Sequence, residues 1–139
     1  KIKIPILNMP KLVFNETKNN CKKGSKIGLL ATDATIKTKI YEKFFENRFY
    51  LVTPTKKLQN ISVNKSIKLV KMGRTKEAEK AIKTSVNYLI KQKCKKIILG
   101  CTELPIAIFA YKSFKKAKLS KIFLDPNLIL AKASMKKYK

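Results

Sequence analysis

The 139-residue sequence contains no histidine. Histidine is the side chain that most often moves protons near neutral pH, and it is also the commonest metal ligand. Its absence excludes Cys-His and Ser-His catalytic pairs, because both need an imidazole as the base. Any catalysis by this chain must therefore use thiols, carboxylates, lysines or hydroxyls.

Cysteine is scarce, and its positions are Cys21, Cys94 and Cys101. The number is odd and no two cysteines have Cys-x-x-Cys spacing, which argues against a disulfide framework and against a structural zinc site. We therefore expect no bound metal, and a reducing cytoplasm is the simplest location for the chain.

Long apolar runs are missing as well. No segment approaches the roughly 18 consecutive apolar residues of a membrane span, so we expect no membrane partner. The sequence starts at Lys1 without a charged-then-apolar leader, which predicts a fragment without a secretory signal. With 45% hydrophobic and 29% charged residues, the composition is typical of one globular domain.

Arginine is rare although the chain is strongly basic. The sequence has 33 Lys or Arg residues against 8 Asp or Glu, for a formal net charge of +25, yet only Arg48 and Arg74 are arginines. Phosphate and base recognition favours the bidentate fork of arginine, and the lysines are spread through every segment. We interpret the charge as a solvated surface and expect no nucleic-acid partner.

Short apolar runs alternate with longer amphipathic stretches. The runs lack strict polar alternation, which is typical of strands buried on both faces of a parallel sheet. They are Ile4–Leu7, Lys26–Ala31, Phe49–Val52, Lys96–Gly100 and Ile122–Leu124. Helices are predicted at Thr35–Glu46, Asn60–Met72 and Thr75–Lys93, shortly after Cys101, and from Asp125 to about Tyr138. This order predicts an α/β fold with a doubly wound parallel sheet and ligands at the carboxyl ends of the strands.

Cys101 follows one predicted strand and precedes a helix. The N-terminus of a helix stabilises a thiolate and so lowers the pKa of a nearby thiol, which makes Cys101 a candidate reactive cysteine. The alternative is a small core residue, because free cysteines are often buried.

A hydroxyl-rich loop, Thr32 to Thr35, follows the strand Lys26–Ala31. Thr35 is a natural N-cap for the next helix, and Thr32, Thr35 and free backbone amides are also suited to hold a carboxylate. Lys71 has two interpretations as well. It is either one more surface lysine at a helix end or a cation for an anionic ligand.

Five ordered segments resemble aspartate/glutamate racemases. They are KIGLLATDATIKTKIYEKFF (26–45), LVTPT (51–55), LVKMG (69–73), IILGCTELP (97–105) and FLDPNLILA (123–131). Their order and spacing are far more specific than any single segment, and the resemblance extends from about Ile4 onward. Ala34 departs from the glycine that the family often has between the two threonines. The Cys-Asn-Thr motif of the family's first catalytic cysteine does not occur in this sequence.

The resemblance implies a flavodoxin-like fold of two similar four-stranded domains, with the active site between them and one cysteine from each. Residues 1–22 would belong to the incomplete first domain and 25–118 would form the complete second domain. Residues 122–139 would add a strand and helix that return to the first domain. The missing N-terminal half would then be a partner of this chain, and the family commonly forms homodimers.

The implied activity is a cofactor-independent amino-acid racemase, an isomerase that works without pyridoxal phosphate. One thiolate removes the α-proton and a thiol on the opposite face returns a proton. By this resemblance Cys101 is one of the two thiols and Thr102 is a neighbouring binding group. Glu103 stands where glutamate racemases usually have histidine, which favours aspartate, and we expect Glu103 to orient the surroundings of Cys101.

The same resemblance assigns the two carboxylates of a dicarboxylic substrate. Thr32 and Thr35 would hold the α-carboxylate, and Lys71 would bind the side-chain carboxylate. Two other functions remain open: a one-cysteine relative, maleate-isomerase-like or decarboxylase-like, and a non-catalytic α/β module that binds anions. The sequence decides neither aspartate against glutamate nor the oligomeric state.

Overall fold

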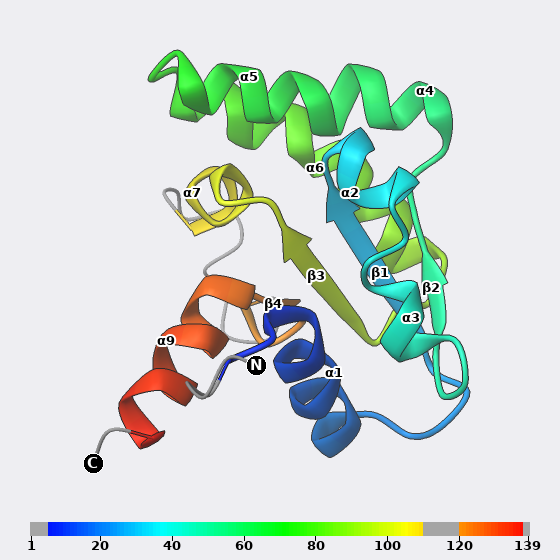
Figure 1. The fold of residues 1–139 in the computed structure, drawn as a ribbon. Helices are drawn as coiled ribbons and strands as arrows, with labels where there is room; N and C mark the ends of the chain where they lie inside the picture. Colours follow the sequence, from blue (N-terminus) through cyan, green and yellow to red (C-terminus); the bar gives the residue numbers. More distant parts are fainter. Residues whose placement is uncertain (1–5, 110–119, 138–139) are drawn as a thin grey trace.

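Four parallel strands form the centre of the computed structural model, which describes residues 6–109 and 120–137 (Figure 1). The strands are β1 (Lys26–Ala31), β2 (Tyr50–Val52), β3 (Lys96–Gly100) and β4 (Phe123–Leu124). Their order in the sheet is β2-β1-β3-β4, and every pairing is parallel. The predicted α/β fold with a parallel sheet is confirmed.

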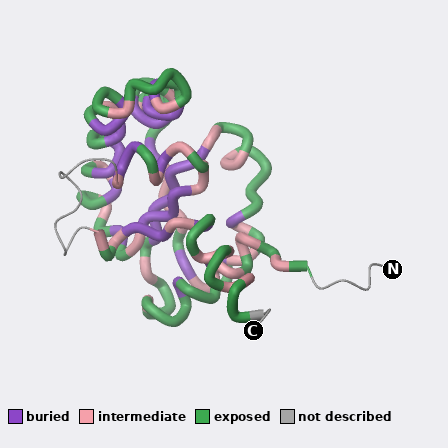
Figure 2. The backbone as a smooth tube through the Cα atoms, turned by 90° about the vertical axis from the view of Figure 1, so that its left-hand side faces the viewer, coloured by how far each residue is buried: buried purple, intermediate pink, exposed green. Residues whose placement is uncertain are grey.

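Both faces of the sheet are packed. Successive residues of a strand point to opposite faces, and in β3 this places Ile97 and Leu99 in one core and Ile98 in the other. The exposed fraction of these three residues is at most 1%. Figure 2 shows that the buried parts of the chain gather in the sheet and on the inner sides of the helices. Burial on both faces explains why the strands appear in the sequence as continuous apolar runs.

One face is covered by α5 (Lys65–Lys71), α6 (Thr75–Lys91) and α7 (Glu103–Phe109). The predicted helix Thr75–Lys93 is confirmed except for its last two residues. It packs closely on β1 at Gly28, where a Cβ atom would lie 2.8 Å from Leu89 Cδ1. Gly73, with a φ of 74°, follows the end of the preceding helix.

The other face carries α1 (Met9–Asn20), which the sequence did not predict, and α3 (Glu42–Phe45). The side chain of Asn8 accepts a hydrogen bond from the Lys11 amide and begins α1. The predicted strand Ile4–Leu7 is not observed at Ile6 and Leu7, and residues 4 and 5 lie outside the described part of the chain.

The helix predicted at Thr35–Glu46 is wrong as a single element. The structure has α2 (Asp33–Lys37) and then α3, and between them Lys39 adopts a φ of 52°. A left-handed residue cannot continue a right-handed helix, so the hydrogen-bond ladder is interrupted there. The N-cap also differs from the prediction, because Thr32 caps α2 in place of Thr35.

The helix predicted to start at Asn60 begins earlier. Thr55 caps α4 (Lys56–Leu58) through a hydrogen bond from the Leu58 amide, and the chain continues through a π-helix, η1 (Gln59–Asn64), into α5. A π-helical turn is wider than an α-helical turn and often lies near a functional site.

The last helix, α9 (Pro126–Lys137), starts where predicted, because Asp125 Oδ1 accepts hydrogen bonds from the Asn127 and Leu128 amides. Residues 138 and 139 lie outside the described chain. The helix contacts α1, and no residue from 127 to 136 is buried (Figures 1 and 2).

β4 lies in the same sheet as the other strands, because Phe123 pairs with Ile97 of β3. The sheet therefore continues across the domain boundary that was predicted between residues 118 and 122. The strand that was predicted to return to the first domain is β4, and it pairs with β3. The division into 1–22, 25–118 and 122–139 otherwise stays a prediction. Among the described residues, no helix combines the length and apolar character needed to cross a membrane.

Candidate active site

The carboxyl ends of β1 and β3 bring the two candidate loops to one edge of the sheet. Ala31 pairs with Gly100, so Thr32 and Cys101 follow at adjacent positions. Gly100 permits this close approach, since a Cβ atom there would lie 3.1 Å from Ala31 Cβ and 3.3 Å from the Leu30 carbonyl oxygen. In a parallel α/β sheet this edge is where ligands bind.

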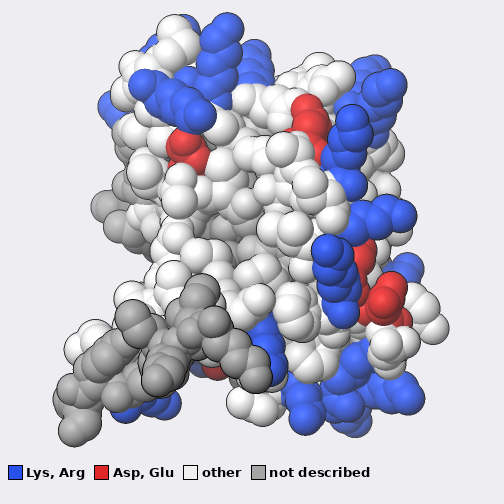
Figure 3. Space-filling view, in the orientation of Figure 1, with Lys and Arg blue, Asp and Glu red and all other residues white. Residues whose placement is uncertain are grey.

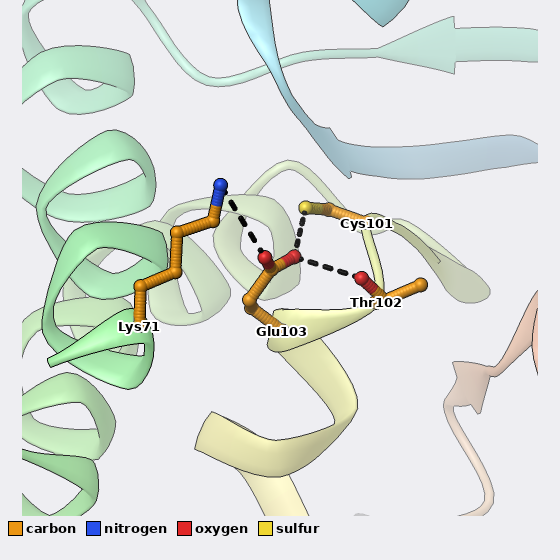
Figure 4. Close-up of polar contacts among 4 residues, drawn as sticks. All are labelled: Lys71, Cys101, Thr102 and Glu103. Atoms are coloured by element: carbon orange, nitrogen blue, oxygen red, sulfur yellow. Dashed lines mark hydrogen bonds and ion pairs between the residues drawn. The ribbon is translucent and has the colours of Figure 1, made fainter. Parts of the chain in front are cut away.

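Glu103 lies at the centre of the polar contacts at this edge (Figure 4). The Cys101 thiol donates a hydrogen bond to Glu103 Oε2 at 2.8 Å, and the Thr102 hydroxyl donates one to the same oxygen at 2.9 Å. Lys71 Nζ lies 3.5 Å from the other carboxylate oxygen, Oε1. The expectation that Glu103 orients the surroundings of Cys101 is consistent with these contacts.

The thiol of Cys101 is held in its protonated form. Burial raises its pKa, and the hydrogen bond to the negatively charged Glu103 raises it further, to about 11. A backbone hydrogen bond and the positive charge of Lys71 oppose the shift without reversing it. The expectation of a lowered thiol pKa is therefore wrong for this arrangement, because desolvation and a carboxylate outweigh the N-terminus of a seven-residue helix.

Glu103 is correspondingly held as a carboxylate. The hydrogen bond from Cys101 is the largest cause that lowers its pKa, and the hydrogen bond from Thr102 and the charge of Lys71 act in the same direction, against desolvation. The Lys71 side chain is 66% exposed, compared with 18% for Glu103. Lys71 is thus a surface lysine at the end of α5 whose ammonium group faces a partly buried carboxylate.

Thr32 and Thr35 form a hydroxyl pair on the opposite loop. Their Oγ1 atoms lie 3.0 Å apart, and Thr32 Oγ1 also accepts a hydrogen bond from the Thr35 amide at 3.2 Å. The Thr32 oxygen therefore already serves as the helix cap, and the Thr35 hydroxyl is part of the same hydrogen-bonded pair.

The predicted site residues line two hollows. Thr35, Cys101 and Thr102 line one of about 170 Å³, which we call the thiol hollow. Thr32 and Lys71 line a shallower groove of about 380 Å³, together with Asp33, Ala34, Asn64, Ile67 and Lys68, which we call the lysine groove. Glu103 lies between the two hollows. It accepts a hydrogen bond from Cys101 of the thiol hollow and forms an ion pair with Lys71 of the lysine groove.

Sequence reasoning missed several residues at this edge. Asn64 Nδ2 donates to Asp33 Oδ2 at 2.8 Å, and Gln59 Nε2 donates to both the Ala31 carbonyl oxygen and Asn64 Oδ1. Tyr41 lines the thiol hollow. Their sequence context gives no signal. Tyr41 resembles a core aromatic in a helix, Asn64 belongs to a segment predicted as an ordinary helix, and Gln59 directly precedes that segment.

The remaining cysteines lie away from this edge. Cys94 is buried in the core beneath α6, where burial raises its pKa to about 11. Cys21 is half-buried against the other core, and burial raises its pKa as well. Within residues 6–109 and 120–137, no three His, Cys, Asp or Glu side chains gather closely enough to hold a metal ion.

Charge on the face that contains this edge is distributed around the rim. Figure 3 shows lysines and arginines at the margins of this face and a largely uncharged middle.

Proteins of known sequence and of known structure resemble the chain. It is 29% identical to the aspartate racemase of Picrophilus torridus, with a TM-score of 0.76 over 99% of this chain and 54% of that one. It is 28% identical over 127 residues to a glutamate racemase of Carboxydothermus hydrogenoformans, covering 88% of this chain and 44% of that protein. An aspartate racemase homologue from Pyrococcus horikoshii shares the fold, with a TM-score of 0.78 at 22% identity over 99% of this chain and 58% of that one.

The chain spans about half the length of these relatives. The family model described as Asp/Glu/Hydantoin racemase matches residues 1–133, which is nearly all of the sequence. The resemblance read from the five sequence segments is thereby confirmed at the level of the family. This chain belongs to the Asp/Glu/Hydantoin racemase family.

Proposed function

We propose that this chain supplies one catalytic half of a cofactor-independent racemase whose substrate is aspartate. The observation that carries the proposal is the contact of one partly buried carboxylate, Glu103, with both the Cys101 thiol and the Lys71 ammonium group. A protonated sulfur beside a strand end is suited to proton transfer, and a nearby cation is suited to a second carboxylate.

Cys101 acts as the proton donor in the arrangement described above. A thiolate contributed by the other half removes the α-proton from one face of the amino acid, and the electron pair stays on the substrate as a carbanion. The Cys101 S–H bond then breaks and its proton joins the opposite face, which leaves Cys101 as a thiolate and the other cysteine as a thiol. The reverse reaction, starting from the other enantiomer, uses the same two sulfurs with exchanged roles. The raised pKa of Cys101 supports the donor role in the first direction, because the thiol is protonated near neutral pH.

The two substrate carboxylates have different partners in this proposal. The hydroxyls of Thr32, Thr35 and Thr102 hold the α-carboxylate beside Cys101, and Lys71 holds the side-chain carboxylate. Lys71 is already paired with Glu103, so the incoming carboxylate shares or replaces that contact. The Thr102 hydroxyl has a single proton, so in this proposal it turns from Glu103 to the α-carboxylate. Glu103 keeps the hydrogen bond from Cys101 and so positions the thiol.

The other half of the enzyme is the partner that we propose for the face made by α1 and α9. These helices and β4 line a groove of about 560 Å³, in which Leu128 is 52% and Met135 is 66% exposed. The chain spans only about half the length of its relatives, which supports a second half of similar size as the proposed partner. A homodimer, as the family resemblance implies, would be a further level of assembly.

Chiral chromatography of L-aspartate in deuterated water tests the function. The chain alone should racemise aspartate very slowly, because inversion needs an acid and a base on opposite faces. Adding the N-terminal half of a complete homologue, which gives what we call the paired assembly, should produce D-aspartate with deuterium at the α-carbon. Cys101→Ser should abolish this gain, with Cys21→Ser as the matched control. Racemisation by the chain alone that depends on Cys101, or no α-deuterium in the paired assembly, would contradict the proposal.

A further inference from the structure

The thiol hollow has a neutral lining. It is made by Met9, Pro10, Thr35, Ile40, Tyr41, Leu99, Gly100, Cys101, Thr102, Pro126 and Asn127, none of which carries a charge near neutral pH when the thiol is protonated. Its volume of about 170 Å³ is larger than a single water molecule needs and is of the size of a small amino acid. A charged group that enters this hollow must be stabilised by neutral hydrogen-bond donors and by backbone dipoles.

Tyr41 is the most enclosed of the polar side chains around the hollow. Its exposed fraction is 3%, and its ring packs edge-on against Phe45 with centroids 6.3 Å apart. Among the residues that the structure describes, its hydroxyl has no hydrogen-bond partner. Leaving a buried hydroxyl unpaired costs about 1–3 kcal/mol, so such a group is typical of a site that a ligand or water completes.

The oxygen of this hydroxyl is not sealed inside the protein. Among the described residues, five side-chain polar atoms are fully enclosed and have no hydrogen-bond partner. They are Glu42 Oε2, Arg48 Nε, Gln59 Oε1, Glu79 Oε1 and Ser85 Oγ. Tyr41 Oη is not among them, so it keeps some accessible surface although the residue is almost wholly buried. Tyr41 also lines the thiol hollow.

The surroundings of the hollow favour an anionic group. The first residues of two twelve-residue helices, Met9 and Pro10 of α1 and Pro126 and Asn127 of α9, lie in its lining. The N-terminus of a helix carries partial positive charge. The side chains of Asn8 and Asp125 accept hydrogen bonds from some of the amides at these helix ends. The main contribution of the helices is therefore the electrostatic field of their dipoles, which favours an anion. The hydroxyl of Tyr41 adds an uncharged group that can donate a hydrogen bond to such an anion.

We infer that the Tyr41 hydroxyl donates a hydrogen bond to a carboxylate oxygen of the amino acid held beside Cys101, which makes Tyr41 a substrate-binding residue. The inference rests on the proposed function for the identity of the ligand. The phenol remains a donor throughout the working pH range, because burial raises its pKa to about 12. It is available before the ligand arrives, since it has no internal bond to break.

Tyr41→Phe in the paired assembly tests the inference, because the ring is kept and only the hydroxyl is lost. Tyr50→Phe is the matched control, since Tyr50 is 67% exposed and lies outside the lining of the hollow. Two ligands are used: L-aspartate, which reports turnover, and succinate, a dicarboxylate that cannot be racemised. The dissociation constant of succinate and the KM and kcat for aspartate are measured for each protein.

We expect Tyr41→Phe to weaken succinate binding and raise the KM for aspartate by at least about tenfold, the effect of a hydrogen bond to a charged group. The thermal unfolding midpoint without ligand should change little, because the hydroxyl has no partner among the described residues and its oxygen keeps accessible surface. Tyr50→Phe should change none of these values. If Tyr41→Phe does not fold, Tyr41→Met, which keeps a flexible apolar side chain there, replaces it.

The outcomes separate this inference from the function on which it rests. Succinate binding that needs Tyr41, without any racemisation, supports Tyr41 and rejects the racemase proposal. Racemisation with the same KM in Tyr41→Phe overturns the role of Tyr41 and leaves the racemase proposal intact. A wild-type assembly that binds neither succinate nor aspartate overturns the inference, because the hollow then takes no carboxylate.

Discussion

The thiol of Cys101 donates its hydrogen bond to the carboxylate of Glu103, two residues further along the chain, with Sγ and Oε2 2.8 Å apart. The contact favours the thiol over the thiolate, because a second negative charge beside Glu103 would be repelled. The ammonium group of Lys71 reduces that repulsion only in part, since it is mostly exposed to solvent. The balance among these three charges sets the reactivity of the sulfur.

Glu103→Gln should make Cys101 more reactive. Removing the charge lowers the pKa of the thiol, and each unit of decrease gives about tenfold more thiolate at pH 8. The rate of iodoacetamide labelling of the peptide that contains Cys101, measured by mass spectrometry, should rise by roughly that factor. Glu77→Gln, an exposed carboxylate paired with Arg74, is the control and should leave the rate unchanged. An equal or slower rate in Glu103→Gln would show that Glu103 does not hold the proton on sulfur.

Cys94→Ala should reduce the loss of stability in alkaline solution. The folded pKa of Cys94 is raised to about 11 from 9.0, so its contribution to stability is complete below pH 9 and is lost as pH rises towards 11. Between pH 8 and 11, urea unfolding of the wild type should lose on the order of 2 kcal/mol more than Cys94→Ala. Deprotonation of the lysines affects both proteins equally, so it cancels in the comparison. Parallel pH profiles would contradict this account of Cys94.

Gly28→Ala should destabilise the fold. The added Cβ would lie 2.8 Å from Leu89 Cδ1, so α6 must move away from β1, at a cost of about 1–3 kcal/mol in the free energy of unfolding. Combining Gly28→Ala with Leu89→Val creates room and should cost less than the sum of the two single changes in a double-mutant cycle. Additive effects in urea unfolding would mean that this contact does not limit the packing.

Lys71→Met should weaken turnover of aspartate in the paired assembly. The methionine keeps most of the apolar stem and removes the charge proposed for the side-chain carboxylate. A loss of about 1.5–3 kcal/mol corresponds to a decrease in kcat/KM of roughly 10- to 150-fold. Lys57→Met, at an exposed position on α4, is the control. An unchanged rate would return Lys71 to the solvated lysines of the surface.

Leu128→Glu should prevent the chain from pairing with the N-terminal half. Leu128 is 52% exposed in the groove between α1 and α9, so the chain itself should tolerate the charge, whereas a covered interface should not. Ile61→Glu is a matched control, because Ile61 is also 52% exposed but lies on η1. Size-exclusion chromatography of the mixed halves measures the pairing. Pairing lost equally in both variants, or in neither, would contradict the proposed face.

The sequence by itself determined the sheet and the position of the candidate site. Buried runs such as Lys26–Ala31 and Lys96–Gly100 are local signals, because residues with both faces covered must be apolar whatever surrounds them. The place of Cys101 at the end of a strand is an equally local signal. Elements with weak or conflicting local signals were predicted less well. Helix α1 was not predicted, and the helix predicted at Thr35–Glu46 is divided at Lys39 by a single left-handed residue.

Only the tertiary structure decided the chemistry of the site. The pKa of Cys101 depends on burial and on where the Glu103 carboxylate points, and spacing in the sequence specifies neither. The partner of Lys71 depends on α5 and α7 coming together, and the place of Tyr41 in the same hollow as Cys101 depends on the turn before α3. Such contacts form between residues distant in sequence, and desolvation and Coulomb energy depend on distances in space. The protonation state of the sulfur is therefore a property of the fold.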